Sequence, residues 1–234
     1  MEGSSYNKDV ANYEILAEYY DDLLQDKDSL DYWLKYIYLK DFNNALELAS
    51  GSAMITGIIL NDGKDIIASD ISERMKEVSK KNFNGEYLIL DMTNFKLDKK
   101  FDLIFCIVDS INYLDDKQLD NCFKCVYEHL NLNGRFIFDM HHLNRLNEFS
   151  LGYIEEGYVK DIAYQWTINS DIIDKTINQH FTFYFENGII QEHHSQNVFE
   201  INYIKDKLIK AGFDVEVVED FVKDEKVLMM GYKK

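Results

Sequence analysis

Short apolar runs alternate along the chain with longer segments in which apolar residues recur every three to four positions. The short runs predict β-strands, and the longer segments predict amphipathic helices. Strand and helix alternate for five cycles, which predicts a parallel sheet with helices on both faces. The expected strands are 45–48, 65–69, 87–90, 101–108 and 135–140, and the expected helices between them are 54–61, 72–82 and 115–130.

The segment before the first of these strands is predicted to be helical. Apolar and aromatic residues recur at helical spacing over 6–24 and again over 29–39, and both ranges are rich in tyrosine. Two compatible interpretations follow. The helices cap the sheet, or they form a lid that closes over a small ligand, with tyrosine hydroxyls as polar contacts.

A period of two begins at about Gly152 and predicts an antiparallel block of strands. Asn187-Gly188 is typical of a type I′ hairpin turn within that block, and Gly212 is a typical helix end. The expected elements are strands over 158–169, 174–186, 189–199, 213–221 and 227–232 and a helix over 201–211.

Together these patterns predict an α/β fold. Its centre is a Rossmann-like seven-stranded sheet with helices on both faces, to which an N-terminal helical lid and an antiparallel β insertion after the fifth strand are added. The expected division is a helical lid (1–40), a ligand-binding α/β core (41–150), an antiparallel insertion that caps the substrate (151–199), and a C-terminal helix and hairpin that complete the core (200–234).

The first strand is followed by a turn, Ala49–Ala53, that contains only Ala, Ser and Gly. Small residues let a ligand approach the backbone, and the next helix presents its unpaired N–H groups there. Asp70 ends the second strand 19 residues after Gly51, where an acid can accept hydrogen bonds from both hydroxyls of a ribose.

Three interpretations of this turn compete. A dinucleotide fold requires G-x-G-x-x-G, which would fall on Ala49, Gly51 and Met54, and Met54 is too bulky for the third position. An E-x-G-x-G-x-G turn fits better, with Glu47 as the acid and Ala at the first and last glycine positions. An ordinary strand–helix–strand unit with a turn of small residues is the third interpretation.

Polar residues also follow the other predicted strands. Asp70, Asp91, Asp109-Ser110 and His141-His142 each lie just after a strand. The carboxyl ends of parallel strands meet at one edge of a sheet, which is the edge where ligands bind in open α/β folds. The sequence therefore predicts a ligand site at this edge.

These motifs, in this order, resemble those of class I S-adenosylmethionine (SAM) methyltransferases over residues 43–232. An opening with Ala17, Tyr20 and Asp21 and the segment D-S-I-N-Y-L from Asp109 are similar to bacterial small-molecule members. An insertion after strand five is also found in aminosugar N-methyltransferases and glycine N-methyltransferase-like enzymes. The resemblance implies SAM as the cofactor, with these binding residues: Tyr20, Trp33, Glu47, Ala49, Gly51, Ala53, Asp70, Ile71, Met75, Asp91, Met92 and Cys106.

Methyl transfer from a sulfonium is a direct displacement, so positioning supplies most of the catalysis. If the acceptor is an amine or a hydroxyl, a base assists, and the candidates are His141, His142 and Asp109. Neighbouring residues on a strand point to opposite faces, so at most one of the two histidines faces the ligand. No clustered metal ligands occur near them, and no metal is expected.

The chain has 42 acidic and 25 basic residues and a net charge of −17. An acidic protein is repelled by phosphate backbones, which disfavours nucleic-acid substrates and favours a small-molecule acceptor. Methyl transfer to RNA or protein, or SAM binding without transfer, are the alternatives. No apolar run could span a membrane. Three cysteines without a pairing pattern indicate a reducing cytoplasm, and a monomer or homodimer is expected.

Overall fold

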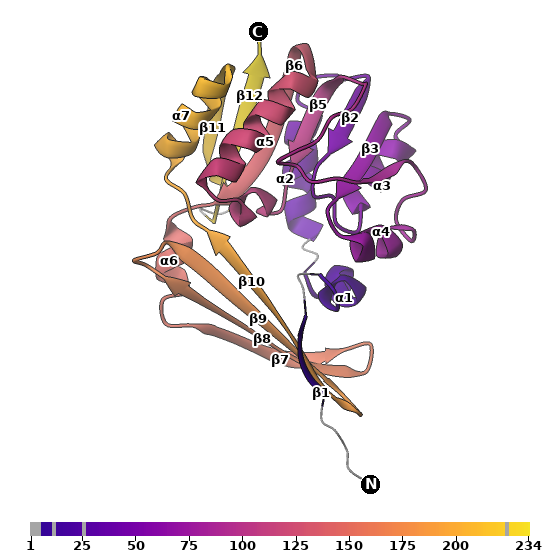
Figure 1. Cartoon of the computed structure of the whole chain (residues 1–234), viewed down its shortest axis with the longest axis vertical. Coiled ribbons are helices and arrows are strands. Elements are labelled where there is room, and N and C mark those ends of the chain that lie inside the picture. Colours follow the sequence, from indigo (N-terminus) through magenta and orange to yellow (C-terminus); the bar gives the residue numbers. More distant parts are fainter. Residues whose placement is uncertain (1–5, 11–12, 25–26, 223–224) are drawn as a thin grey trace. The chain divides into compact units, whose positions relative to one another are not determined.

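The computed structural model describes residues 6–10, 13–24, 27–222 and 225–234 (Figure 1). The chain forms two compact units. The first unit contains Met1–Gln25 and Asn144–Asn197, and the second contains Asp26–Leu143 and Val198–Lys234. The segment 1–40, expected to form one helical lid, is therefore divided between the two units.

The second unit contains a seven-stranded sheet in the order β11-β12-β6-β5-β2-β3-β4. The five strands from β6 to β4 are parallel, and β12 is antiparallel to both of its neighbours. This topology confirms the predicted α/β fold with a C-terminal hairpin. The strands are β2 (Asn44–Glu47), β3 (Asp65–Asp70), β4 (Tyr87–Ile89), β5 (Phe101–Cys106), β6 (Leu130–His141), β11 (Phe213–Phe221) and β12 (Lys226–Lys233).

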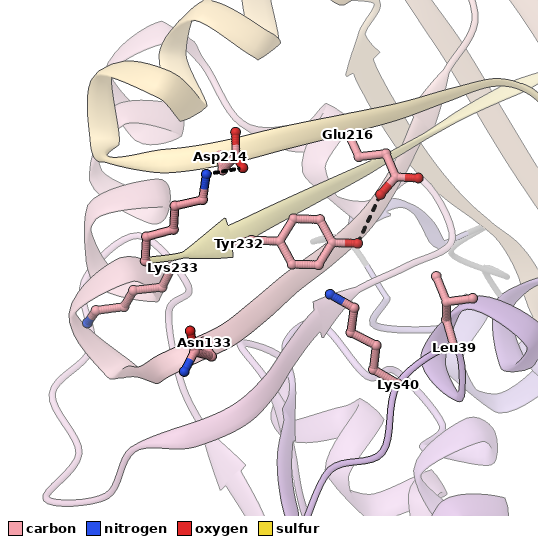
Figure 2. A pocket seen from close by; sticks show the side chains of 8 residues that line it. Leu39, Lys40, Asn133, Asp214, Glu216, Tyr232 and Lys233 are labelled. Atoms are coloured by element: carbon pink, nitrogen blue, oxygen red, sulfur yellow. Dashed lines mark hydrogen bonds and ion pairs between the residues drawn. The ribbon is translucent and has the colours of Figure 1, made fainter.

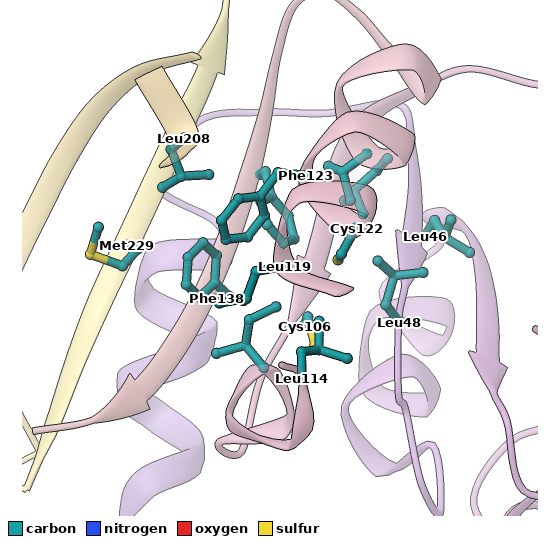
Figure 3. Packing of buried hydrophobic residues seen from close by; sticks show 14 of the residues in the cluster. Leu46, Leu48, Cys106, Leu114, Leu119, Cys122, Phe123, Phe138, Leu208 and Met229 are labelled. Carbon is teal, nitrogen blue, oxygen red and sulfur yellow. The ribbon is translucent and has the colours of Figure 1, made fainter. Parts of the chain in front are cut away.

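Helices cover both faces of this sheet because successive residues of its strands point to opposite sides. Phe138 of β6 packs with Phe123 and Leu208 in one hydrophobic cluster (Figure 3). Its neighbour Ile137 belongs to a second cluster, together with Ile59. The helices of the first cluster are α5 (Asp116–His129) and α7 (Ile201–Ala211), and those of the second are α2 (Lys27–Ile37) and α3 (Met54–Asn61).

Local signals set several of these helix ends. The sequence predicts helices over 54–61 and 201–211, and α3 and α7 have these bounds. Ser72 caps α4 (Glu73–Ser79) by accepting a hydrogen bond from a backbone N–H of its first turn. Gly212 ends α7 with a φ of 106°, a left-handed conformation that suits glycine.

The first unit contains a five-stranded sheet in the order β1-β10-β9-β8-β7, in which β1 is parallel to β10 and the other pairs are antiparallel. The described residues of this unit also include two helices. Its elements are β1 (Tyr6–Val10), α1 (Leu16–Leu23), α6 (Asn144–Glu148), β7 (Tyr153–Val159), β8 (Ile162–Asp171), β9 (Thr176–Phe185) and β10 (Gly188–Asn197).

Three predictions for this unit are wrong in detail. The helix expected over 6–24 begins only at Leu16, because Tyr6–Val10 pairs with the otherwise open edge of β10. The strand expected over 158–169 is two strands joined at Lys160-Asp161, where both residues have positive φ. The turn expected at Asn187-Gly188 lies one residue earlier, because Gly188 already pairs with Phe185.

Glu192 of β10 fixes the start of α1 within the first unit. Its buried carboxylate accepts hydrogen bonds from the backbone N–H groups of Tyr13, Ile15 and Leu16, and from His194 at 2.7 Å. Burial alone would raise the pKa of Glu192, but these hydrogen bonds lower it below its ordinary value. The side chain therefore acts as an N-terminal cap supplied by a distant strand.

Candidate active site

The carboxyl ends of the five parallel strands carry most of the polar residues predicted as a site. Glu47 ends β2, Asp70 ends β3 and His141 ends β6, whereas Asp91 and Asp109 follow β4 and β5. Because the strands are parallel and adjacent, these residues lie along one edge of the sheet.

The turn between β2 and α3 has the backbone of a glycine-rich loop. Ala49, Gly51 and Ala53 have φ values of 51°, 53° and 55°, so every second residue is left-handed. The sequence suggests that alanine only loses access to positive φ, but both alanines adopt it. A left-handed conformation costs an L-residue roughly 1–2 kcal/mol, so the tertiary structure imposes this backbone.

Asp70 links the turn to the start of α4. Its carboxylate accepts hydrogen bonds from the Gly51 N–H at 3.0 Å and from the Ser72 N–H at 2.9 Å, one on each oxygen. Burial raises the pKa of Asp70, although the two N–H groups oppose this shift. A carboxylate oxygen has a second lone pair, so the fixed carboxylate can accept further hydrogen bonds.

Two apolar side chains beside Asp70 differ in exposure. Ile71 is 70% exposed, which is unusual for isoleucine, whereas Met75 is buried in the first turns of α4. The Met75 sulfur would lie 3.9 Å from a Cβ added to Gly51, so Met75 packs against the glycine-like turn. The edge therefore offers a fixed carboxylate next to an exposed apolar surface.

Glu47 is buried at the end of β2 and accepts a hydrogen bond from the Thr56 hydroxyl. Burial raises the pKa of Glu47 to about 8, although Thr56 opposes the shift. A buried carboxylate with a raised pKa is stabilised in its charged form by a cation.

Asp91 and Met92 form the next part of the edge. Asp91 is exposed, and its Oδ1 accepts hydrogen bonds from both the N–H and the hydroxyl of Thr93, each at 2.8 Å. The Met92 sulfur lies 3.9 Å from Cys106 Sγ. Cys106 is fully buried in the core, and burial raises the pKa of its thiol. Its thiol is therefore covered by the core and not exposed at the edge.

The ends of β5 and β6 carry an ion-pair cluster. Lys226 Nζ lies 2.6 Å from Asp109 Oδ2 and 3.1 Å from Asp139 Oδ2. His141 Nδ1 lies 3.5 Å from Asp109 Oδ1, and the His141 N–H donates to Asn112 Oδ1 at 3.1 Å. The structure thus brings together two of the predicted catalytic residues, Asp109 and His141.

Trp33 of α2 contacts the same cluster. Its ring centroid lies 5.2 Å from Lys226 Nζ, within the range of a cation–π interaction. Its buried Nε1 has no hydrogen-bond partner among the described residues. His142 is half-buried and donates its backbone N–H to Glu225. Tyr20 lies on α1 in the first unit, where its ring centroid is 6.0 Å from that of Tyr13.

Lys226 and Asp139 also lie at this cluster, although the sequence did not predict them there. Asp139 lies inside β6 and Lys226 begins β12, 117 residues after Asp109 in the chain. Because β12 runs antiparallel to β6, Lys226 pairs with His141 at the carboxyl edge. The available signal in the sequence was a lysine at the start of the last strand. Only the strand order shows that this lysine lies beside Asp109.

A cavity of about 610 Å³ lies elsewhere in the second unit (Figure 2). Tyr232, which lines it, pairs with Arg135, several residues before the end of β6. Tyr232 donates to Glu216 at 3.1 Å, and Lys40 Nζ lies 4.2 Å from the Tyr232 ring centroid. None of the residues predicted for the site lines this cavity.

Two kinds of feature are absent from residues 6–10, 13–24, 27–222 and 225–234. None of the helices there has the length and hydrophobicity needed to cross a membrane. The same ranges contain no group of three or more His, Cys, Asp or Glu side chains that could hold a metal ion.

Residues 45–134 match the family described as "Methyltransferase domain". Over this segment the chain is similar to that family. The match begins in β2 and ends inside β6, so it includes the glycine-like turn and the ends of β2 to β5. The prediction of a methyltransferase is confirmed.

Similar proteins agree with this prediction. A protein from Geobacillus sp. (strain WCH70), provisionally named a methyltransferase, is 24% identical over 228 residues, which cover 89% of this chain and 92% of that protein. The structure of an S-adenosylmethionine-dependent methyltransferase from Clostridium acetobutylicum ATCC 824 has a TM-score of 0.77 and 22% identity, covering 94% of this chain and 98% of that one.

The sugar N-methyltransferase KedS8 from Streptoalloteichus sp. ATCC 53650 has a TM-score of 0.81 and 16% identity, covering 100% of this chain and 98% of that one. These likenesses extend over the added β-sheet as well as the core. They confirm the predicted class I fold with an insertion after the fifth parallel strand.

Proposed function

We propose that this methyltransferase takes a methyl group from SAM and moves it by direct displacement to a nitrogen or oxygen of a small-molecule acceptor. The observation that carries the proposal is the row of strand-end carboxylates beside a glycine-like turn in a methyltransferase domain. When bound, SAM supplies an electrophilic methyl group on a positively charged sulfur.

The arrangement around Asp70 suits the nucleoside part of this cofactor. Its two oxygens are already oriented by Gly51 and Ser72, and their remaining lone pairs can accept from the two ribose hydroxyls. The exposed Ile71 and the buried Met75 would flank the adenine ring. Asp70 thus offers a polar contact for the ribose, and the adjacent Ile71 offers an apolar contact for the base.

The other predicted binding residues divide between the two ends of the cofactor. Asp91 would accept from the adenine amino group through its second oxygen, and the Met92 N–H would donate to the ring. Glu47 would hold the ammonium of the methionine part, which would favour its ionised form. The remaining candidates are the turn residues Ala49 and Ala53, the main chain of Cys106, and the aromatic side chains of Trp33 and Tyr20.

The acceptor is proposed to be small because the protein is strongly acidic, with a net charge of −17. Repulsion from phosphate backbones disfavours RNA. A sugar N-methyltransferase among the structural neighbours fits an amine or hydroxyl acceptor. We propose that Asp109 and one of His141 and His142 orient that acceptor or take its proton.

Calorimetry with SAM and its demethylated product tests the cofactor. Asp70→Ala removes hydrogen bonds to both ribose hydroxyls, each of about 1.5–3 kcal/mol when one partner is charged. The two bonds together contribute about 3–6 kcal/mol, so SAM should bind roughly 10²- to 10⁴-fold more weakly, at 1.4 kcal/mol for each factor of ten. Asp65→Ala is the matched control, because Asp65 begins the same strand and forms an exposed ion pair with Lys99. Unchanged affinity in Asp70→Ala, or binding of NAD instead of SAM, would contradict the proposal.

Transfer of a labelled methyl group from SAM tests the acceptor class. Panels of small amines and alcohols, total tRNA and unmodified protein would be compared at equal SAM concentration. We expect label on a small amine or alcohol. Label confined to tRNA or protein would support the alternative acceptor class, and SAM binding without any transfer would support a cofactor-binding protein.

The cellular setting is part of the same proposal. Cys106, Cys122 and Cys125 are all free thiols, which fits a reducing cytoplasm. The oligomeric state, monomer or homodimer, stays a prediction that sedimentation velocity would test.

A further inference from the structure

Lys226 is a shielded lysine held between two carboxylates. Its Nζ lies 2.6 Å from Asp109 Oδ2 and 3.1 Å from Asp139 Oδ2, and only 13% of its side chain is exposed. Removing an ammonium from water costs several kcal/mol unless it is paired. The two carboxylates therefore explain why Lys226 can occupy this position, at the first residue of β12 and the carboxyl edge of β6.

Asp139 and Lys226 together fix Asp109. Asp139 is fully buried, and its Oδ2 accepts the Asp109 N–H at 3.2 Å as well as the lysine. Val108 and Asp109 both have positive φ, 61° and 57°, in the loop after β5. A strained backbone persists where surrounding contacts hold it. Asp139 holds the main chain of this loop, and Lys226 holds the Asp109 carboxylate.

The second oxygen of Asp109 faces a histidine. His141 Nδ1 lies 3.5 Å from Asp109 Oδ1, and the His141 backbone is tied to Asn112 Oδ1. An imidazole whose Nδ1 proton is directed at a carboxylate keeps its lone pair on Nε2. Catalytic hydrogen bonds are often long before the substrate binds. A contact of this kind would favour a neutral His141 that carries its proton on Nδ1 and its lone pair on Nε2.

We propose that Lys226 is a positioning residue that orients the Asp109 carboxylate, so that His141 holds its proton on Nδ1 and accepts the acceptor's proton on Nε2. This inference rests on the proposed methyl transfer. The lone pair of the acceptor nitrogen or oxygen forms the bond to the methyl carbon, the sulfur–carbon bond breaks, and its electron pair stays on sulfur. The acceptor proton moves to His141 Nε2 and then to solvent.

The charges around Asp109 support this role. Burial raises the pKa of Asp139 to about 6, despite the opposing effect of Lys226. Burial alone would lower the pKa of Lys226, but Asp109 and Asp139 together raise it. Without the lysine, two neighbouring carboxylates would share a proton. Among the described residues, Lys226, Asp139 and His141 are titratable groups that contact Asp109, and the Trp33 ring faces the lysine.

The tautomer of His141 tests the inference without knowledge of the acceptor. Long-range ¹H–¹⁵N spectra of histidine-labelled protein would be recorded at about pH 9, where an ordinary imidazole of pKa ~6.5 is neutral. His141→Gln assigns the signals among the six histidines. We expect the Nδ1–H form in the wild type and a shift toward the Nε2–H form in Lys226→Met.

Lys207→Met is the matched control. Lys207 also bridges two aspartates, Asp116 at 2.7 Å and Asp120 at 2.8 Å, but these lie on α5 and not at the sheet edge. The control should keep the wild-type spectrum. An Nε2–H form in the wild type, or an unchanged tautomer in folded Lys226→Met, would overturn the inference.

Two further measurements separate the possible failures. If Lys226→Met does not fold, Asp109→Asn replaces it, because loss of the carboxylate should also shift His141 toward the Nε2–H form, and an unchanged tautomer there would overturn the inference. Calorimetry with SAM on the same samples tests the proposed function separately. A wild type that shows the Nδ1–H form but binds no SAM would refute the proposed function and leave the positioning of His141 standing.

Discussion

The two left-handed alanines of the turn after β2 allow a test of the fold that needs no ligand. Ala49 and Ala53 have φ values of 51° and 55°. A left-handed conformation costs alanine roughly 1–2 kcal/mol, whereas glycine adopts it freely. Ala49→Gly and Ala53→Gly should each release that strain without altering the path of the chain.

Two losses oppose this gain. Glycine makes the unfolded chain more flexible, which costs about 0.4–1 kcal/mol, and a buried methyl group contributes about 0.8 kcal/mol. Ala49 is half-buried, so Ala49→Gly should raise the free energy of unfolding by about 0.5 kcal/mol. Ala53 is fully buried, so the gain and losses should nearly cancel.

Ala45→Gly is the matched control. Ala45 is also fully buried, but it lies in β2 with ordinary strand geometry. It would suffer both losses without any release of strain, so its free energy of unfolding should fall by about 1.5 kcal/mol. The expected order of stability is therefore Ala49→Gly above Ala53→Gly above Ala45→Gly.

Tryptophan fluorescence during urea unfolding measures this order of stability in the second unit, which contains the turn. Trp33 and Trp166 are the two tryptophans of the chain, and they belong to the second and first units respectively. A Trp166→Phe background leaves Trp33 as the reporter of the unit that contains the turn. If Ala49→Gly is destabilised as much as Ala45→Gly, the turn does not have the left-handed backbone described here.

Two other substitutions test contacts that connect distant segments. Glu192→Gln should destabilise the first unit by about 2 kcal/mol, because charged hydrogen bonds to the N-terminus of α1 are lost, and exposed Glu156→Gln should not. The pKa of Glu192 is lowered in the folded state, so its contribution to stability is present above the ordinary glutamate pKa of ~4.3 and is lost as the pH falls through the folded pKa. Urea unfolding of the wild type and Glu192→Gln at pH 7 and at about pH 3 checks this. An equal difference in stability between the two proteins at both pH values would contradict it. Arg135→Met should destabilise the second unit by about 3 kcal/mol, because Arg135 donates to the carbonyl oxygens of Ile37 and Lys40 at the end of α2; unchanged unfolding of Trp33 would refute that role.

Elements with strong local signals were predictable. The apolar spacing and end residues of α3 and α7 predict their bounds, because cap residues and periodicity act within one or two turns. The strand-end acids were also predictable, since strands that alternate with helices form a parallel sheet whose carboxyl ends meet. Asp70 and Asp91 therefore lie at the predicted edge.

Elements that depend on a distant partner could not be predicted from the sequence. Tyr6–Val10 has helical spacing but forms a strand, because this segment pairs with β10. Lys160-Asp161 turns the chain without glycine because the flanking strands pair on both sides. In each case tertiary contacts outweighed a local preference of well under 1 kcal/mol per residue.

The sequence by itself determined the α/β class, the resemblance to methyltransferases and the acids at the ends of the strands, because these follow from period and spacing along the chain. Only the tertiary structure decided that Lys226 faces Asp109 and His141, since an antiparallel last strand brings the start of β12 to the end of β6. It also decided that two alanines take the backbone of glycines. Both depend on contacts between segments far apart in sequence, which local patterns do not record.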